Sequence, residues 1–127
     1  MEKLILLDTS VLIEHFRKKD KSKTTLYKLS EKGCRFSISA VTYYEIFIGQ
    51  KKEDALFWKN LMNVFIVEPF ELESSRKTVE IFQLLRKNNK VIETPDLFIA
   101  ATALSKGIPI ATLNKKHFEQ IEGLEVI

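Results

Sequence analysis

The sequence predicts an α/β protein, a three-layer α/β/α sandwich around a central parallel sheet of four to five strands. Apolar runs too short for helices alternate with longer segments in which apolar residues recur at helical spacing. Strands that alternate with helices form parallel β-α-β units with right-handed crossovers, so helices should cover both faces of the sheet. At 127 residues the chain is long enough for one domain with a true core, and we assign residues 1–127 to a single domain.

Five segments are expected to form the strands, the last of them short: residues 4–7, 35–39, 64–67, 108–112 and 124–127. The first is apolar throughout, as is typical of a strand that is buried on both faces. The second alternates polar and apolar residues, which is the period of a strand with one buried face. The fourth contains Pro109 near its start, where a proline is tolerated.

Six helices are expected, over about residues 10–17, 24–32, 42–49, 51–62, 71–89 and 94–106. Ser10 and Thr94 are the candidate N-caps of the first and last helices. Thr42 and Glu45 have the spacing of a capping box, so Glu45 is expected on the first turn of its helix. The longest helix is expected to turn these apolar residues inward: Val79, Phe82 and Leu85.

Three acids and one amide are expected to meet at one edge of the sheet. Asp8 ends the first strand, Glu45 starts the helix after the second, Asp96 starts the helix before the fourth, and Asn114 follows the fourth. The carboxyl ends of parallel strands share one edge, and open α/β sheets bind ligands there. Asp96 reaches this edge only if the long helix before it lies obliquely, since five extended residues span about 17 Å.

Each acid also has a purely structural interpretation. Asp8 could accept backbone N–H groups at the start of a helix, Glu45 could complete a capping box with Thr42, and Asp96 could complement a helix dipole. Carboxylates that gather at one place repel one another, however, and a cation is the usual remedy. Oxygen ligands without cysteine or histidine favour Mg²⁺ or Mn²⁺ over zinc. Such a metal suggests phosphate chemistry, in which it polarises a phosphoryl oxygen and activates water.

Several function classes are excluded or disfavoured. No segment approaches the roughly 20 apolar residues of a membrane span, and no signal peptide is evident, so we expect a cytoplasmic protein. One cysteine, Cys34, cannot form an internal disulfide. The glycine-rich phosphate loop and the serine-hydrolase motif are absent. His15 lies among apolar helix neighbours and is interpreted as structural. His117 is placed in a polar turn, where a solvated or phosphate-contacting role stays open and a role as a metal ligand is disfavoured.

Four segments together resemble the PIN-domain ribonucleases, specifically the VapC-type toxins of type II toxin–antitoxin pairs: residues 7–13, 39–45 with Gly49, 95–103 and 112–118. The resemblance spans almost the whole chain and rests on the order and separation of the segments. It implies an endoribonuclease that uses Mg²⁺, for which Mn²⁺ can substitute. It also implies a catalytic set of Asp8, Glu45, Asp96 and Asn114, in which the three acids bind the metal. Hydroxyls would orient these acids or a metal-bound water: Thr9, Ser10 and Thr112.

Asn114 departs from the family pattern, in which many relatives have an aspartate at the matching position. An asparagine offers an oxygen without negative charge, so a second metal would be held less tightly. Glu93 and Glu119 are candidates to compensate, although both also fit a surface position. We therefore expect one firmly bound metal, and a second that is weak or supplied with the substrate.

RNA approaching an acidic site needs cations beside it. The lysines expected nearest the edge are Lys51, Lys52, Lys115 and Lys116. We expect these to contact phosphates without reading bases, and solvated surface lysines are the alternative. Aromatic residues concentrate in the two middle helices, more than a core needs: Tyr43, Tyr44, Phe47, Phe57 and Trp58. The surplus suggests a homodimer surface or a groove for an antitoxin helix, partners that the resemblance also implies.

Two other functions fit the same residues. One is a PIN-like nuclease of RNA maturation outside any toxin system, and the other is a catalytically silent module that binds RNA or protein. A small antitoxin reading frame directly upstream would favour the toxin, and absence of Mn²⁺-dependent cleavage would favour the silent module.

Overall fold

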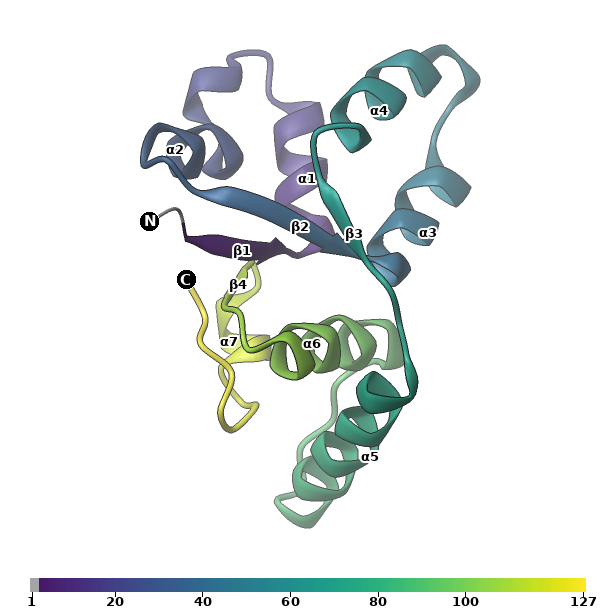
Figure 1. Ribbon diagram of the computed structural model, residues 1–127, viewed down its shortest axis with the longest axis vertical. Coiled ribbons are helices and arrows are strands. Elements are labelled where there is room, and N and C mark those ends of the chain that lie inside the picture. The colour runs from purple at the N-terminus through teal and green to yellow at the C-terminus, as the bar shows by residue number, and fades with distance from the viewer. Residues whose placement is uncertain (1–2) are drawn as a thin grey trace.

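The computed structural model describes residues 3–127 and places helices on both sides of a parallel sheet (Figure 1). Its elements follow in this order: β1 (Leu4–Leu7), α1 (Thr9–Arg17), the 3-10 helix η1 (Lys21–Lys23), α2 (Thr25–Glu31), β2 (Arg35–Ser39), α3 (Ala40–Gly49), the 3-10 helix η2 (Lys52–Asp54), α4 (Ala55–Met62), β3 (Ile66–Glu68), α5 (Leu72–Lys87), α6 (Thr94–Lys106), β4 (Ile110–Ala111) and α7 (Lys115–Phe118). The predicted α/β class is confirmed. The short helix α7 was not predicted.

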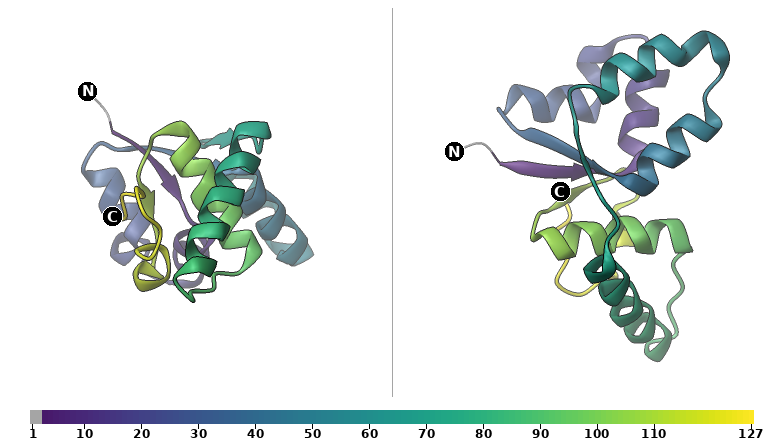
Figure 2. Two further views of the ribbon diagram at one scale, coloured as in Figure 1. Left: turned by 90° about the horizontal axis from the view of Figure 1, so that it is seen from below. Right: turned by 45° about the vertical axis from the view of Figure 1, so that its right-hand side comes forward.

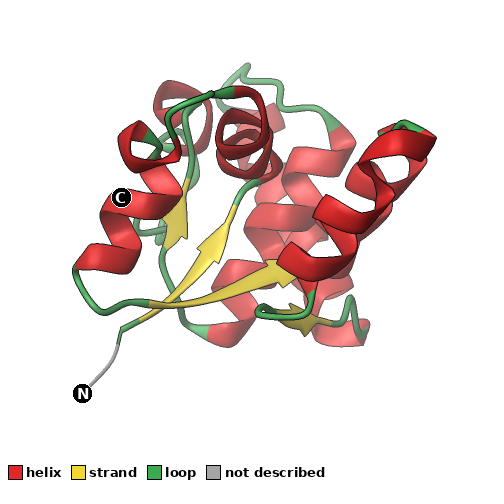
Figure 3. Cartoon of the chain, turned by 90° about the horizontal axis from the view of Figure 1, so that it is seen from above, coloured by secondary structure: helices red, strands yellow, loops and turns green. Residues whose placement is uncertain are grey.

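The sheet has four parallel strands in the order β3-β2-β1-β4, so β1 lies between two partners (Figure 3). Leu6 pairs with Ser37 of β2 on one side and with Ile110 of β4 on the other. The expected fifth strand is reduced to one isolated parallel bridge between Val126 and Ile110. Because β4 itself is only two residues long, it offers the C-terminal segment too short an edge to extend the pairing.

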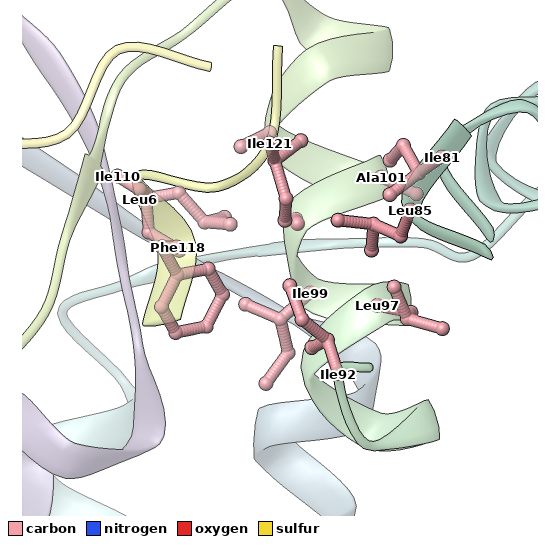
Figure 4. Close-up of a cluster of buried hydrophobic side chains, with 12 residues drawn as sticks. Leu6, Ile81, Leu85, Ile92, Leu97, Ile99, Ala101, Ile110, Phe118 and Ile121 are labelled. Atoms are coloured by element: carbon pink, nitrogen blue, oxygen red, sulfur yellow. The ribbon is translucent and has the colours of Figure 1, made fainter. Parts of the chain in front are cut away.

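Alternate residues of β1 point into two different cores, and this gives the molecule its three layers. Leu6 belongs to a buried cluster with residues of α5 and α6 and with Phe118, which lies near it in Figure 4. Ile5 and Leu7 belong to a second cluster, with residues of α1, α2 and α4. All three of these leucine and isoleucine side chains are fully buried. Figure 2 shows the two groups of helices on opposite sides of the sheet. No helix among residues 3–127 has the length and apolar character needed to cross a membrane.

Three of the predicted N-cap residues are wrong, by one to three positions. Asp8, not Ser10, is the N-cap of α1, and Glu93, not Thr94, is that of α6. Helix α3 begins at Ala40, and Ser39 caps it by accepting the backbone N–H of Thr42. Glu45 is therefore the sixth residue of α3, past the first turn, and the capping box with Thr42 does not form. In each case more than one hydroxyl or acid lies near the start of the helix, and the sequence pattern did not identify which of them is the N-cap.

Helix α5 buries a narrower stripe than predicted. Leu85 is buried as expected, but Val79 is 54% exposed and Phe82 is 50% exposed. The buried positions include Ser74 and Ile81, because α5 packs chiefly against one neighbour, α6. Figure 1 shows α5 slanting away from the sheet, with the following segment returning to the start of α6. This oblique course satisfies the condition set for Asp96 to reach the edge of the sheet.

Candidate active site

Asp8 is a buried carboxylate fixed by hydroxyl groups rather than by helix capping. It ends β1 with only 4% of the residue exposed, and its side chain accepts no backbone N–H of α1. The hydroxyls of Ser10 and Thr112 donate to its Oδ2 over 2.7 and 2.8 Å, respectively. A buried charge is tolerated only when such donors replace water. The purely structural interpretation of Asp8 as a capping side chain is therefore wrong.

Thr112 links Asp8 to the segment that follows β4. Its hydroxyl accepts the backbone N–H of Asn114 over 3.0 Å while donating to Asp8. Ser10 adds a second link, because its hydroxyl accepts the backbone N–H of Leu113 over 3.1 Å. The end of β1 and the end of β4, adjacent in the sheet, are thus joined by side chains as well as by strand pairing. Ser10 and Thr112 lie where supporting residues were predicted.

Glu45 is held by the first helix of the chain. The hydroxyl of Thr9, at the start of α1, donates to Glu45 Oε1 over 2.8 Å. The same hydroxyl lies 3.0 Å from that of Thr42, a fully buried residue of α3. Thr9 therefore supports Glu45 rather than Asp8, and the helix beginning at Ala40 places Glu45 over α1.

Asp96 lies on the first turn of α6, and its contact is a histidine. Its Oδ2 is 3.1 Å from Nε2 of His117, an ion-pair contact rather than a well-aligned hydrogen bond. Burial raises the pKa of the Asp96 carboxyl above its usual value, and the negative charge of Asp8 raises it further. His117 lowers this pKa, while Glu45 contributes a smaller upward effect. The three acids thus sense one another electrostatically, as their placement at one edge predicted.

Each of the three carboxylates uses one oxygen for a protein contact and keeps the other. Asp8 Oδ2, Glu45 Oε1 and Asp96 Oδ2 have the partners described above, and within residues 3–127 no hydrogen bond reaches their second oxygens. Over the same residues, no three acidic, histidine or cysteine side chains are close enough to form a complete metal cage. Mg²⁺ does not require one, since it usually keeps several waters and binds one or two carboxylates together with substrate phosphates. The free hard oxygens therefore suit Mg²⁺ or Mn²⁺.

Asn114 stands at the start of α7 with its side chain exposed and without a capping bond. Its backbone N–H is tied to Thr112, so the residue is attached to the Asp8 network through the main chain. The amide is thereby placed beside the acids but is not engaged by them. This position agrees with the one inferred from the sequence. The alternatives Glu93 and Glu119 are both exposed, and Glu93 adds slightly to the upward shift of the Asp96 pKa.

The four predicted lysines are exposed, and within the described chain none of them forms an ion pair: Lys51, Lys52, Lys115 and Lys116. Lys51 lines the same hollow as Glu45, and the lysine pair of α7 precedes the histidine that contacts Asp96. Lys21 differs from these four. Its ammonium donates to the carbonyls of His15, Phe16 and Lys18 at the end of α1, so its role is structural.

A hollow of about 300 Å³ opens beside Glu45, between α1, α3 and α4. Apolar side chains and charges of both signs line it: Ile13, Phe16, Arg17, Glu45, Ile46, Gly49, Gln50, Lys51, Asp54 and Trp58. Of the aromatic residues in this region, Trp58 is buried and Phe47 and Phe57 are partly buried, whereas Tyr43 and Tyr44 are exposed. The core thus uses some of these aromatic residues and leaves Tyr43 and Tyr44 on the surface, as predicted.

The contact of His117 with the acids was not predicted. The residues around His117 indicated a polar turn, whereas the structure places it on α7 with its Nε2 buried against Asp96. Phe118 was the available signal. An apolar residue directly after a histidine, with Asn114 three positions before that histidine, indicates a short capped turn that packs on the core. No local pattern identifies Asp96 as the partner, because the two residues are distant in the chain.

Comparisons with known proteins show what the chain is similar to. The PIN domain profile matches residues 5–124 of the chain. Ribonuclease VapC1 of Methanocaldococcus jannaschii is 37% identical over an alignment that covers 98% of this chain and 88% of that protein. The crystal structure of VapBC2 from Rickettsia felis bound to a promoter DNA fragment contains a chain of the same fold, with a TM-score of 0.86, 21% identity, and coverage of 98% of this chain and 97% of that one. A toxin–antitoxin complex from Klebsiella pneumoniae matches with a TM-score of 0.74 and 25% identity, covering 97% and 95% of the two chains.

Proposed function

Because the chain belongs to the PIN-domain family and is similar to a curated VapC ribonuclease along nearly its whole length, we propose that it is a Mg²⁺- or Mn²⁺-dependent endoribonuclease and the toxin of a toxin–antitoxin pair. The observation that supports this most directly is the set of three carboxylates at one edge of the sheet, each with one oxygen in a protein contact and the other without a partner among residues 3–127. The carboxylates repel one another, since Asp8 and Glu45 both raise the pKa of Asp96, and a bound cation would relieve this repulsion.

Asp8 and Asp96 would hold the ion through their free oxygens, with Glu45 contributing its own. When bound, the ion polarises a phosphoryl oxygen and lowers the pKa of water. The chain's own residues do the rest. Ser10 and Thr112 hold Asp8 rigidly through Oδ2, and Thr9 holds Glu45 through Oε1.

The proposed substrate is RNA, contacted through its phosphates. Four exposed lysines have no ion-pair partner in the described chain and would supply the positive charge that a carboxylate site otherwise lacks: Lys51, Lys52, Lys115 and Lys116. A shallow site on a small chain fits a single-stranded region better than a duplex. The reaction is placed in the cytoplasm as part of this proposal.

The proposed protein partner is an antitoxin that occupies the hollow beside Glu45. A neighbouring structure is a toxin–antitoxin complex, and we extend that assembly to this chain. The apolar floor formed by Phe16, Ile46 and Trp58 suits the apolar face of a partner helix, and Glu45 at its edge suits a basic side chain. An antitoxin in this position would both cover the hollow and neutralise an acid of the site.

A homodimer is proposed as the working assembly, because apolar side chains remain uncovered on two helices. Tyr43, Tyr44 and Ile48 of α3 are exposed, as are Val79 and Phe82 of α5. Light scattering of the purified chain would give its mass. A single species at the mass of one chain across micromolar concentrations would contradict this part of the proposal.

The decisive experiment compares cleavage of a cellular RNA pool by the wild-type chain and by its Asp8→Asn and Asp96→Asn variants, with Mn²⁺ and with EDTA. Cleavage should require the metal and should fall by more than about 100-fold in both variants. Glu122→Gln is the matched control, because it removes an exposed carboxylate outside the site and should cut like the wild type. Equal cleavage by all four proteins would refute the catalytic assignment. No cleavage by the wild type would favour a silent binding module.

A further inference from the structure

His117 is placed rigidly, although it sits on a helix of only four residues. The next residue, Phe118, is fully buried in the core beneath the sheet (Figure 4). The backbone N–H of His117 donates to the carbonyl of Asn114 over 3.1 Å, and its ring meets that of Phe118 edge-on at 5.8 Å between centroids. The imidazole therefore has a fixed base from which to reach the acids.

The contact of His117 is confined to one atom of one acid. Its Nε2 is buried, lies 3.1 Å from Asp96 Oδ2 and finds no other partner among residues 3–127. The second oxygen of Asp96 has no hydrogen bond within those residues. A carboxylate that has one oxygen in contact with a neighbouring side chain is oriented so that its other oxygen can bind a metal ion. Thr112 orients Asp8 in the same way.

We propose that His117 is a positioning residue for the metal site: by holding Oδ2 of Asp96, it aims the other oxygen of this acid at the space shared with Asp8. This inference rests on the metal site of the proposed function. The segment 112–118 then supports two acids at once, Asp8 through Thr112 and Asp96 through His117.

The test measures Mn²⁺ affinity of the full, metal-stripped chain in the absence of RNA, from the free-Mn²⁺ signal in electron paramagnetic resonance. His117→Ala should weaken binding by about 10–100-fold, the usual effect of removing a group that orients a ligand. His117→Gln should recover most of the affinity, because its amide nitrogen can reach the position of Nε2. His117→Asn is one carbon shorter and should behave like alanine. Gln83→Ala, which removes an exposed and uncharged side chain of α5 outside the site, should bind as the wild type does.

Comparison of glutamine with asparagine keeps the test valid if the alanine variant folds poorly, since both amides are polar and similar in size. Equal Mn²⁺ affinity in the wild-type, alanine and asparagine proteins would overturn the inference, as would tighter binding, which would make His117 a competitor of the ion. Its failure is distinguishable from failure of the proposed function. If His117→Ala binds Mn²⁺ more weakly but the wild-type chain cleaves no RNA, the role of His117 stands and the ribonuclease proposal fails. If His117→Ala binds Mn²⁺ like the wild type and the wild-type chain cleaves RNA, the ribonuclease proposal stands and the role of His117 fails. Absence of Mn²⁺ binding by the wild-type chain would overturn both.

Discussion

The hydroxyl of Thr112 donates to Oδ2 of Asp8 over 2.8 Å, joining residues 104 positions apart at the ends of two neighbouring strands. Thr112 is 1% exposed, so water cannot replace its hydroxyl as a donor. The same oxygen of Asp8 takes a second hydrogen bond from Ser10. Together the two donors satisfy a carboxylate that would otherwise be an uncompensated buried charge.

Thr112→Val removes this donor while keeping the shape of the side chain. The free energy of unfolding should fall by about 1.5–3 kcal/mol, the range for a hydrogen bond to a charged group. Urea denaturation of the metal-free protein measures the change. Thr102→Val is the matched control, because its hydroxyl is equally buried but donates to the neutral carbonyl of Phe98 over 2.8 Å. A loss in the Thr112 variant no greater than in the control would contradict the charged role of the contact.

Asp96→Asn should alter how the stability of the metal-free protein depends on pH. The pKa of Asp96 is raised above 3.8 in the folded chain by burial and by Asp8, so the folded state binds this proton more tightly than the unfolded state does. Wild-type stability therefore falls as pH rises from the ordinary value through the raised one, and the full penalty is present at neutral pH. Asparagine does not ionise. Relative to the wild type, the variant should thus gain stability between acidic and neutral pH.

Denaturant unfolding in EDTA at a series of pH values measures this gain. Glu122→Gln serves as the control, since it lies on the surface and outside the acid cluster. A difference between Asp96→Asn and the wild type that stays constant across the series would show that the folded state does not disfavour the charge of Asp96.

Asn114→Asp should strengthen binding of a second metal. The wild-type chain is expected to bind one Mn²⁺ firmly, because Asn114 contributes an oxygen but no charge. Its side chain is exposed and makes no capping bond, so an aspartate fits the same place without losing a contact. Calorimetric titration should show one tight site per wild-type chain and a tighter second event in the variant. Two equally tight sites in the wild type would contradict the expectation.

Replacing the four lysines at positions 51, 52, 115 and 116 by alanine should weaken RNA binding in a salt-dependent manner. Each lost phosphate contact should reduce the slope of log affinity against log salt by about 0.7 for a single strand. Filter binding to one RNA at several salt concentrations gives the slope. A variant with alanine at Lys19, Lys23, Lys28 and Lys32 removes the same charge from the region of α1 and α2, and its slope should change less. Equal slopes in the two variants would mean that only net charge matters.

The sequence was sufficient for the class of fold, because local patterns carry that information. The uniformly apolar stretch before Asp8, the alternation at Arg35–Ser39 and the proline at the start of α6 each reflect the surroundings of a few adjacent residues. It also indicated that Asp8 and Glu45 lie at one edge, since the carboxyl ends of parallel strands share that edge. Asp96 reaches the same edge because α5 lies obliquely, which the sequence could state only as a condition. The roles of these acids in binding metal and cleaving RNA stay predictions.

Tertiary structure decided which groups hold those acids. The partners of Asp8, Glu45 and Asp96 are Thr112, Thr9 and His117, which lie 104, 36 and 21 positions away in the chain. Contacts over such separations depend on packing angles between elements, and hydroxyls near a helix start can serve as caps or as donors with equal local plausibility. For the same reason Val79 and Phe82 of α5 could not be assigned outward from their spacing. The width of the face that α5 buries is determined by its packing against α6, not by the spacing of its apolar residues.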